Sequence, residues 1–240
     1  MCGRFAVDDE TNAFMEDLVR EHGSKALEHW RDYITPNYNT APTDRVAVVR
    51  QSEGERFPEW VRWGMVSPTA PQFGDIGRRP VINARIETVH KNGLFKGPFE
   101  TRRCVVPVLG YYEWQQREDG RQPFFIRETG AQLALAGVVN YWRDKAKPAG
   151  DPEERLPSMS IITLDAHVTP GEVHDRMPAF LMSDAIDDWL GDHLDTEDRL
   201  QLLRESSHAV ADGIEFYEVS RAVNASGKNA QRGPELIDAV

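Results

Sequence analysis

Cysteine is scarce in this chain, which has two in 240 residues, Cys2 and Cys104. Neither belongs to a Cys-x-x-Cys pair, and no histidine-rich pair stands at metal-ligand spacing. These absences exclude a disulfide framework, and we expect no metal site and no cofactor. A chain of this length can bury a sufficient hydrophobic core without such crosslinks.

Long hydrophobic runs are also missing. Nowhere do 18 apolar residues follow one another, and no basic segment followed by an apolar run stands at the N-terminus. We therefore expect no membrane span, no membrane partner and no signal peptide. The expected location is the cytoplasm.

Lysine is the third scarcity: six lysines accompany 22 arginines, and 39 Asp and Glu residues leave a net charge of -11. A net negative charge argues against a polyanionic partner. The acidic residues crowd stretches such as 184–198, however. This clustering leaves room for an arginine-lined groove elsewhere on an acidic surface.

The middle of the chain is rich in short runs of β-branched and aromatic residues, which predict strands. The predicted strands are Arg45–Arg50, Glu59–Val66, Cys104–Trp114, Pro123–Arg127, Leu133–Trp142, Met159–Leu164 and Glu215–Val219. Between two of them, Asp144 to Pro157 has the composition of a surface loop.

Helices are predicted near the two ends of the chain. The first runs from about Asp9 to Glu21, with Asp8 or Thr11 as its cap and Gly23 as its stop. Two more helices near the C-terminus are predicted to have Ser183 and Thr196 as caps. Because helices and strands do not alternate regularly, we predict one α+β domain over residues 1–240, with a mostly antiparallel sheet or barrel.

Cys2 is the residue of greatest chemical interest, because removal of Met1 would leave its thiol and a free α-amine on adjacent carbons. Such an aminothiol can attack an aldehyde through nitrogen to give an imine, and then close a five-membered thiazolidine through sulfur. An α-amine has a reference pKa of about 7.7 to 8.0 and a thiol about 8.5, so a neighbouring base can release either group near neutrality. Cys2 is thus a candidate nucleophile, whereas Cys104 lies in an apolar run and is expected in the core.

Three further clusters follow apolar segments. Asn83 and Arg85 follow a short apolar segment, and their side chains would point to the same side if the segment is a strand. An amide can orient a nucleophile, and a guanidinium can bind a phosphate. Glu113 ends a hydrophobic strand among aromatic residues, which would raise its pKa and suit it to proton transfer. His174 and Arg176 lie on a loop, as a candidate proton shuttle and a candidate phosphate ligand.

Five motifs occur in order: Met-Cys-Gly-Arg at 1–4, Asn-Ala-Arg-x-Glu at 83–87, Arg-Cys at 103–104, Tyr-Tyr-Glu-Trp at 111–114 and His-Asp-Arg-Met-Pro at 174–178. This order resembles the SRAP family of SOS-response-associated peptidase-like proteins, which includes the 5-hydroxymethylcytosine-binding embryonic-stem-cell-specific protein. The resemblance covers nearly the whole chain, including residues 38–42, the Ile162-Thr163 strand and residues 219–224.

The resemblance implies an enzyme of the DNA damage response that shields abasic sites in single-stranded DNA by a reversible covalent crosslink. In that reaction Cys2 would form a thiazolidine with the sugar aldehyde. Asn83 would position the amine and the sugar, and Glu113 would move protons. His174 would assist opening of the sugar ring and reversal of the crosslink.

The resemblance also implies residues that bind DNA. Arg4, Arg85 and Arg176 would hold backbone phosphates, and Pro42, Trp114 and Thr163 would make further DNA contacts. The expected partner is an abasic single strand, including one at a junction with a duplex, and the protein would associate with the nucleoid. An unstacked sugar is the one whose aldehyde can be reached.

The sequence departs from the family after Trp63-Gly64, where a Pro-x-Trp element is usual and this chain has Met65 to Ile76 instead. The residue that would wedge into the DNA is then Phe73 or Ile76. An aromatic residue stacked on a base contributes about 1 to 3 kcal/mol.

Two other functions use the same residues. An N-terminal cysteine hydrolase could attack a peptide carbonyl with an activated amine or thiol, helped by an oxyanion-stabilising amide. A non-catalytic reader of single-stranded or modified DNA would not need Cys2 at all. The three arginines beside the reactive cluster favour the DNA crosslink over the hydrolase.

Overall fold

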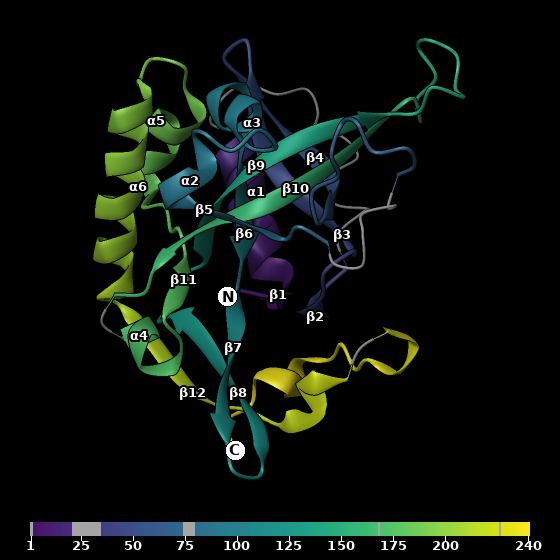
Figure 1. Cartoon of the computed structure of the whole chain (residues 1–240). Helices are drawn as coiled ribbons and strands as arrows, with labels where there is room; N and C mark the ends of the chain where they lie inside the picture. The colour runs from purple at the N-terminus through teal and green to yellow at the C-terminus, as the bar shows by residue number, and fades with distance from the viewer. Residues whose placement is uncertain (1, 21–34, 74–79, 168, 226) are drawn as a thin grey trace.

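The computed structural model describes residues 2–20, 35–73, 80–167, 169–225 and 227–240 of the chain (Figure 1). At its centre five strands close into a small barrel, in the order β10-β4-β3-β6-β9 and back to β10. All neighbouring pairs are antiparallel except the parallel pair of β10 and β4. The barrel strands are β3 (Arg45–Ser52), β4 (Glu55–Trp63), β6 (Arg103–Val108), β9 (Leu133–Arg143) and β10 (Arg155–Asp165).

A second, five-stranded antiparallel sheet lies beside the barrel and has the order β12-β8-β7-β1-β2. Its strands are β1 (Phe5–Val7), β2 (Asn37–Thr40), β7 (Gly110–Arg117), β8 (Gly120–Glu128) and β12 (Ile214–Glu218). Two short strands, β5 (Asn83–Arg85) and β11 (Arg176–Pro178), add to β10 on the barrel.

The α-helices lie around these sheets, and the helices of the C-terminal part pack on one side (Figure 1). They are α1 (Asp9–Arg20), α2 (Ile86–Val89), α3 (Lys96–Thr101), α4 (Thr169–Val173), α5 (Ile186–Leu190) and α6 (Thr196–Ala211). The predicted α+β class and the mostly antiparallel barrel are therefore confirmed, as are helices toward both ends. The three short helices α2, α3 and α4 in the middle of the chain were not predicted.

Most predicted strands are present, with shifted ends. The strand predicted over Glu59–Val66 is wrong at its C-terminal end, because β4 stops at Trp63 and Gly64 follows with a φ of +120°, which a side chain would strain. The predicted loop between β9 and β10 is shorter than expected, since β10 already begins at Arg155.

The single strand predicted over Cys104–Trp114 is two strands that belong to different sheets. β6 pairs with β3 and β9 in the barrel, whereas β7 pairs with β1 and β8. The change of partner occurs at Leu109, whose backbone N–H donates to the carbonyl of Ala6 at 2.9 Å. This switch carries Glu113 out of the barrel and beside the N-terminal segment.

The helix caps differ from those predicted at the C-terminal helices. Asp8 does cap α1, since its carboxylate accepts from the backbone N–H of Thr11 at 2.8 Å. Asp195, not Thr196, caps α6 by accepting from the N–H of Asp198, and Ser183 begins a 3-10 turn, η2 (Ser183–Ala185), without a capping bond. Glu21 and Gly23 lie outside the described residues.

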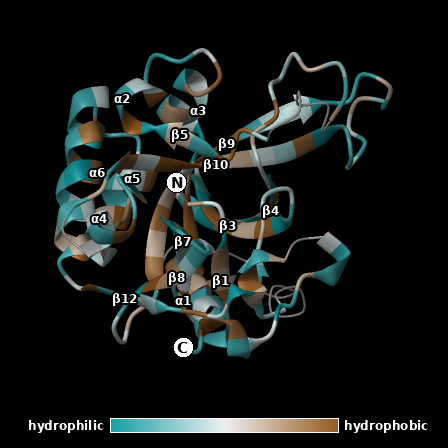
Figure 2. Cartoon of the chain, turned by 60° about the horizontal axis from the view of Figure 1, so that its bottom comes forward, coloured by the Kyte–Doolittle hydropathy of each residue, from teal (hydrophilic) through white to brown (hydrophobic). Residues whose placement is uncertain are grey.

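Hydrophobic residues concentrate in the central strands, as Figure 2 shows. One buried cluster runs from Cys2 in the N-terminal segment to Ile214 in β12, and it includes Cys104, as expected. In the described part of the chain, no helix is long and apolar enough to cross a membrane.

Gly110, at the start of β7, allows the close approach of β1, β7 and β8. A Cβ atom there would lie 2.7 Å from the backbone oxygen of Ile126. We therefore expect Gly110→Ala to lower the free energy of unfolding by about 1 to 3 kcal/mol, measured by chemical denaturation. Gly93→Ala is the control, because a Cβ at Gly93 meets nothing within 4 Å. Equal stability of the two variants would contradict this account of the strand junction.

Candidate functional site

The pairing of β1 with β7 places the N-terminal segment at the site. Phe5 lies opposite Tyr111 and Ala6 opposite Gly110. The pairing continues beyond the strand, because the N–H of Tyr112 donates to the carbonyl of Arg4 at 2.9 Å. Residues 2–4 consequently run beside the segment that carries Glu113.

Cys2 is fully buried at the inner end of this segment. The Nδ2 of Asn83, at the start of β5, donates to the carbonyl oxygen of Cys2 at 2.9 Å. Burial raises the pKa of the Cys2 thiol far above its usual range, and the negative charge of Glu113 raises it further. The thiol is therefore protonated near neutral pH, and it needs a base before it can react as a thiolate.

Glu113 is the buried carboxyl group of the site, with 3% of its surface exposed. Burial raises its pKa above the ordinary value of 4.5, and the charge of His174 acts in the opposite direction. A carboxyl group with a raised pKa can both give and take a proton at working pH.

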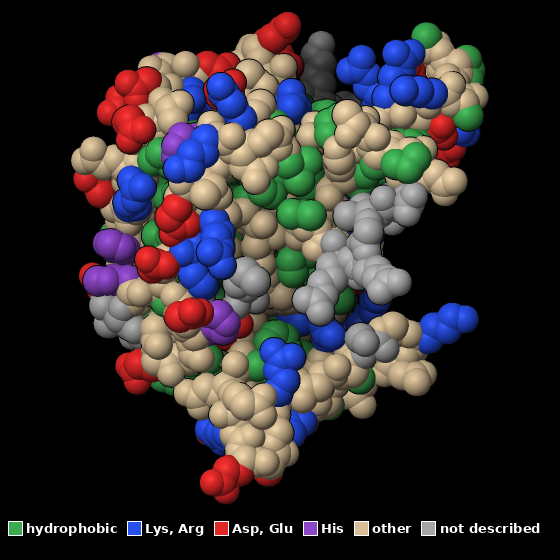
Figure 3. All heavy atoms as spheres, viewed as in Figure 1, with side chains coloured by type: hydrophobic (Ala, Val, Ile, Leu, Met, Phe, Trp, Pro, Cys, Tyr) green, Lys and Arg blue, Asp and Glu red, His purple; other side chains and the backbone are tan. Residues whose placement is uncertain are grey.

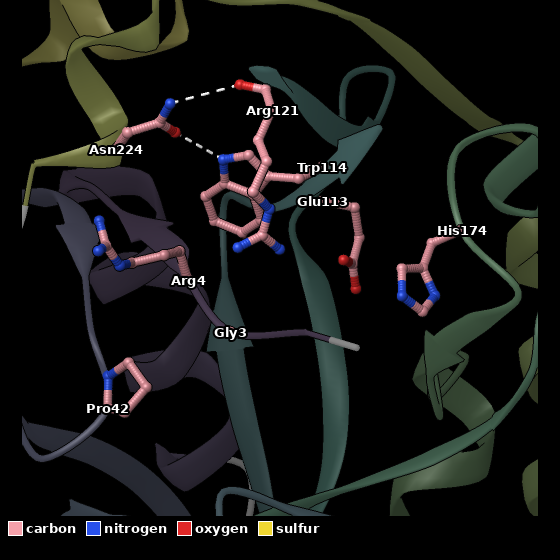
Figure 4. Close-up of a pocket in the computed structure, with 8 residues that line it drawn as sticks. All are labelled: Gly3, Arg4, Pro42, Glu113, Trp114, Arg121, His174 and Asn224. Carbon is pink, nitrogen blue, oxygen red and sulfur yellow. Dashed lines mark hydrogen bonds between the residues drawn. The ribbon is translucent and has the colours of Figure 1, made fainter. Parts of the chain in front are cut away.

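His174 lies between α4 and β11. A hydrogen bond from Gln115 Nε2 to the carbonyl of Glu172, at 3.0 Å, connects this part of the chain to β7. Its Nδ1 lies 3.0 Å from the backbone nitrogen of Arg176 and 2.7 Å from Asp175 Oδ1. Nδ1 can thus accept from Arg176 in one tautomer or donate to Asp175 in the other. Figure 4 shows the imidazole and the Glu113 carboxyl group facing one another, so the ring can carry a proton to or from this carboxyl group.

Glu113 and His174 open onto a cavity of about 600 Å³ (Figure 4). Five predicted residues line it: Arg4, Pro42, Glu113, Trp114 and His174. Cys2 and Asn83 adjoin it, because Cys2 directly precedes the lining residue Gly3 and Asn83 bonds to Cys2. The structure thus brings together all four predicted catalytic residues.

Gly3, Arg121 and Asn224 also line the cavity, and none of them was predicted as a site residue. The guanidinium of Arg121 lies over the Trp114 ring at 5.8 Å, and Asn224 Oδ1 accepts from the Trp114 indole at 2.6 Å. The sequence carried a signal for Arg121: the Asp119-Gly120 pair is typical of a hairpin turn. That turn pairs β7 with β8 and puts Arg121 near Trp114.

Tyr111 is a further neighbour that sequence reasoning missed. Its hydroxyl is buried without a hydrogen-bond partner among the described residues. Burial raises its pKa, and the charges of Glu113 and Cys2 raise it further. The Tyr-Tyr-Glu-Trp motif includes this tyrosine, but sequence reasoning gave it no role of its own.

The three predicted phosphate ligands differ in their surroundings. Arg4 uses Nη1 to donate to Asn39 Oδ1 at 2.6 Å and to the carbonyls of Val223 and Ala225. Arg85 is exposed on β5.

Arg176 is buried and forms ion pairs with Glu87 at 2.7 Å and Asp165 at 2.6 Å. Thr163 is fully buried, and its carbonyl accepts from Arg176 Nη2 at 2.7 Å. Arg176 and Thr163 therefore hold β10, β11 and α2 together.

Phe73 is not among the residues that line the cavity. Its ring packs at 5.7 Å from that of Trp142 on β9, and the Trp142 indole donates to the carbonyl of Ala70. The alternative wedge, Ile76, and Met1 lie outside the described residues. Within the described ranges, no group of three or more His, Cys, Asp or Glu side chains could hold a metal ion.

The raised pKa of Glu113 makes a prediction for stability. A folded state that holds a proton more tightly than the unfolded state loses stability as pH rises above 4.5. Glu113→Gln removes this loss. The free energy of unfolding of the variant minus that of the wild type should therefore be larger at pH 8 than at pH 4. Urea denaturation at both pH values measures this, with the exposed Glu118→Gln as control. A difference that does not depend on pH would refute the assigned shift.

Comparison with known proteins places this site in a family. The model for SOS response associated peptidase (SRAP) matches residues 1–226. Abasic site processing protein YoaM of Bacillus subtilis is 32% identical and YoqW 31%, each alignment covering at least 98% of both chains. Abasic site processing protein HMCES of Xenopus tropicalis is 29% identical over all of this chain and 78% of its own length.

Solved structures share the fold. A protein from Bacteroides thetaiotaomicron superposes over the whole of both chains with a TM-score of 0.77 at 20% identity. One from Bordetella bronchiseptica superposes over 91% of this chain and 100% of its own with a TM-score of 0.68 at 22% identity. With the family model matched from residue 1 to residue 226, the chain belongs to the SRAP family.

Proposed function

We propose that this protein processes abasic sites in single-stranded DNA by forming a covalent crosslink through Cys2. The observation that carries the proposal is the grouping of Cys2 and Asn83 with Glu113 and His174 at one cavity. The relatives named as abasic site processing proteins support it. The resulting enzyme is lyase-like in its attack on a sugar carbon.

The reaction begins with opening of the abasic sugar, which exposes an aldehyde at C1′. His174 transfers a proton between the sugar oxygens in this step. After loss of Met1, the α-amine of Cys2 adds to the aldehyde carbon. The buried Oδ1 of Asn83, which has no partner among the described residues, can accept a hydrogen bond from that amine.

Glu113 moves the protons of the next two steps. It protonates the hydroxyl of the carbinolamine, which leaves as water and gives a protonated imine (iminium). It then takes the thiol proton as sulfur bonds to C1′, and the electron pair of the C=N π bond returns to nitrogen to complete the neutral thiazolidine. One water is released overall, and the same steps in reverse free the DNA.

The order of attack follows from the pKa of the thiol. Because burial keeps the thiol protonated, the amine is the first nucleophile and the thiol closes the ring.

The DNA contacts are proposed as follows. Phosphates are bound by Arg85 and by the guanidinium nitrogens of Arg4 other than Nη1. Arg176, already paired with two carboxylates, shares its charge with a phosphate and is positioned by Thr163. Pro42 and Trp114 contact the strand in the cavity, and Phe73 is the candidate wedge at a duplex junction. The larger of two buried clusters, which runs from Cys2 to Ile214, supports a single domain.

Substitution of Cys2 tests the proposal. Wild-type protein should form a complex with an abasic oligonucleotide that survives denaturing electrophoresis, and Cys2→Ala should form none, because it lacks the sulfur that traps the imine. Cys104→Ala is the control, since Cys104 is buried in the barrel. A denaturation-resistant complex of Cys2→Ala would defeat the proposal, and wild-type protein that binds without crosslinking would favour the non-catalytic reader.

A further inference from the structure

A second cavity adjoins the catalytic cavity. It has a volume of about 470 Å³ and shares two lining residues, Arg4 and Pro42, with the first. Its far wall is formed by Ala225 and by residues of the segment 227–232, from which Lys228 and Arg232 line it. A strand that leaves the catalytic cavity past Arg4 and Pro42 therefore enters the second one.

The wall of this cavity is fixed by hydrogen bonds that its backbone carbonyls accept. Asn39 Nδ2 donates to the carbonyl of Gln231 at 2.9 Å, and the backbone N–H of Tyr38 donates to the carbonyl of Arg232 at 3.1 Å. At the Ala225 end of the wall, Arg4 Nη1 donates to the carbonyl of Ala225 at 3.2 Å. The basic side chains are thus presented on a preformed surface, which lowers the entropy cost of binding.

The charge of the second cavity is opposite to that of the whole protein. Arg4, Lys228 and Arg232 face it, and Asp44 is the acidic residue in its lining. Arg232 Nη2 lies 3.8 Å from Asp44 Oδ2, a long contact between two partly exposed groups, which contributes little. In Figure 3, Lys and Arg side chains border a hollow next to the C-terminal segment, whereas Asp and Glu gather over α5 and α6.

Because the second cavity is cationic on a protein with a net charge of -11, it concentrates anions at one place. We infer that the second cavity binds the phosphodiester backbone on one side of the abasic nucleotide, with Lys228 and Arg232 contacting phosphates. The inference rests on the proposed function, and it gives the bound strand a direction through the protein. A guanidinium and an ammonium group are both suited to phosphate oxygens.

The salt dependence of binding tests the inference. The probe is an oligothymidylate with a tetrahydrofuran abasic analogue, which cannot open to an aldehyde and so reports non-covalent affinity. Lys228→Gln combined with Arg232→Gln should reduce the slope of log affinity against log salt by about 1.4, since each single-strand phosphate contact contributes about 0.7. Lys91→Gln combined with Lys96→Gln makes the same change in net charge at exposed positions outside both cavities, and it should leave the slope unchanged.

Two one-sided oligonucleotides locate the contact. One carries the tetrahydrofuran at its 5′ end and the other at its 3′ end, so that nucleotides extend on one side only. The Lys228 and Arg232 substitutions should change the slope for one of the two and not for the other. Equal changes for both, no change for either, or the same change in the control variant would overturn the inference.

Crosslinking separates this inference from the proposed function. Wild-type protein that fails to crosslink a true abasic oligonucleotide contradicts the proposed function. Wild-type protein that crosslinks, while the Lys228 and Arg232 substitutions leave every slope intact, contradicts the second cavity alone.

Discussion

The site depends on the pairing of β1 with β7. This pairing runs from Ala6 opposite Gly110 to the bond between Tyr112 and Arg4, and it fixes the N-terminal segment beside Glu113. A chain terminus is ordinarily among the least ordered parts of a protein. Here backbone hydrogen bonds and the burial of Cys2 remove that freedom, so the N-terminal segment is held beside the Glu113 carboxyl group.

Burial raises the pKa of both acidic groups of the site and costs stability. A carboxyl group and a thiol that lie together in the interior each resist ionisation, as the raised pKa values of Glu113 and Cys2 record. The extended buried cluster around them compensates for that cost. In the proposed function, cations that line the two cavities attract DNA to a protein that is acidic overall.

Sequence patterns predicted the fold class and most strands, because β-branched and aromatic runs mark strands locally. They could not predict that residues 104–114 change sheets at Leu109, since partner choice is decided by segments far away in the chain. The motifs predicted Cys2, Asn83, Glu113 and His174 as catalytic residues, and the fold brings these four residues together. Arg121 was missed because its nearness to Trp114 arises from the pairing of β7 with β8. Tyr111 was missed because its burial with Glu113 and Cys2 is a property of the folded chain. The ion pairs of Arg176 with Glu87 and Asp165 were not predicted either.

Intact-mass spectrometry after incubation with an abasic oligonucleotide tests the central claim most directly, because it reports processing and chemistry together. The account predicts a species whose mass is that of the protein without Met1 plus the oligonucleotide, less one water. Protein that keeps Met1 and gains no mass under conditions where it binds the oligonucleotide would contradict it.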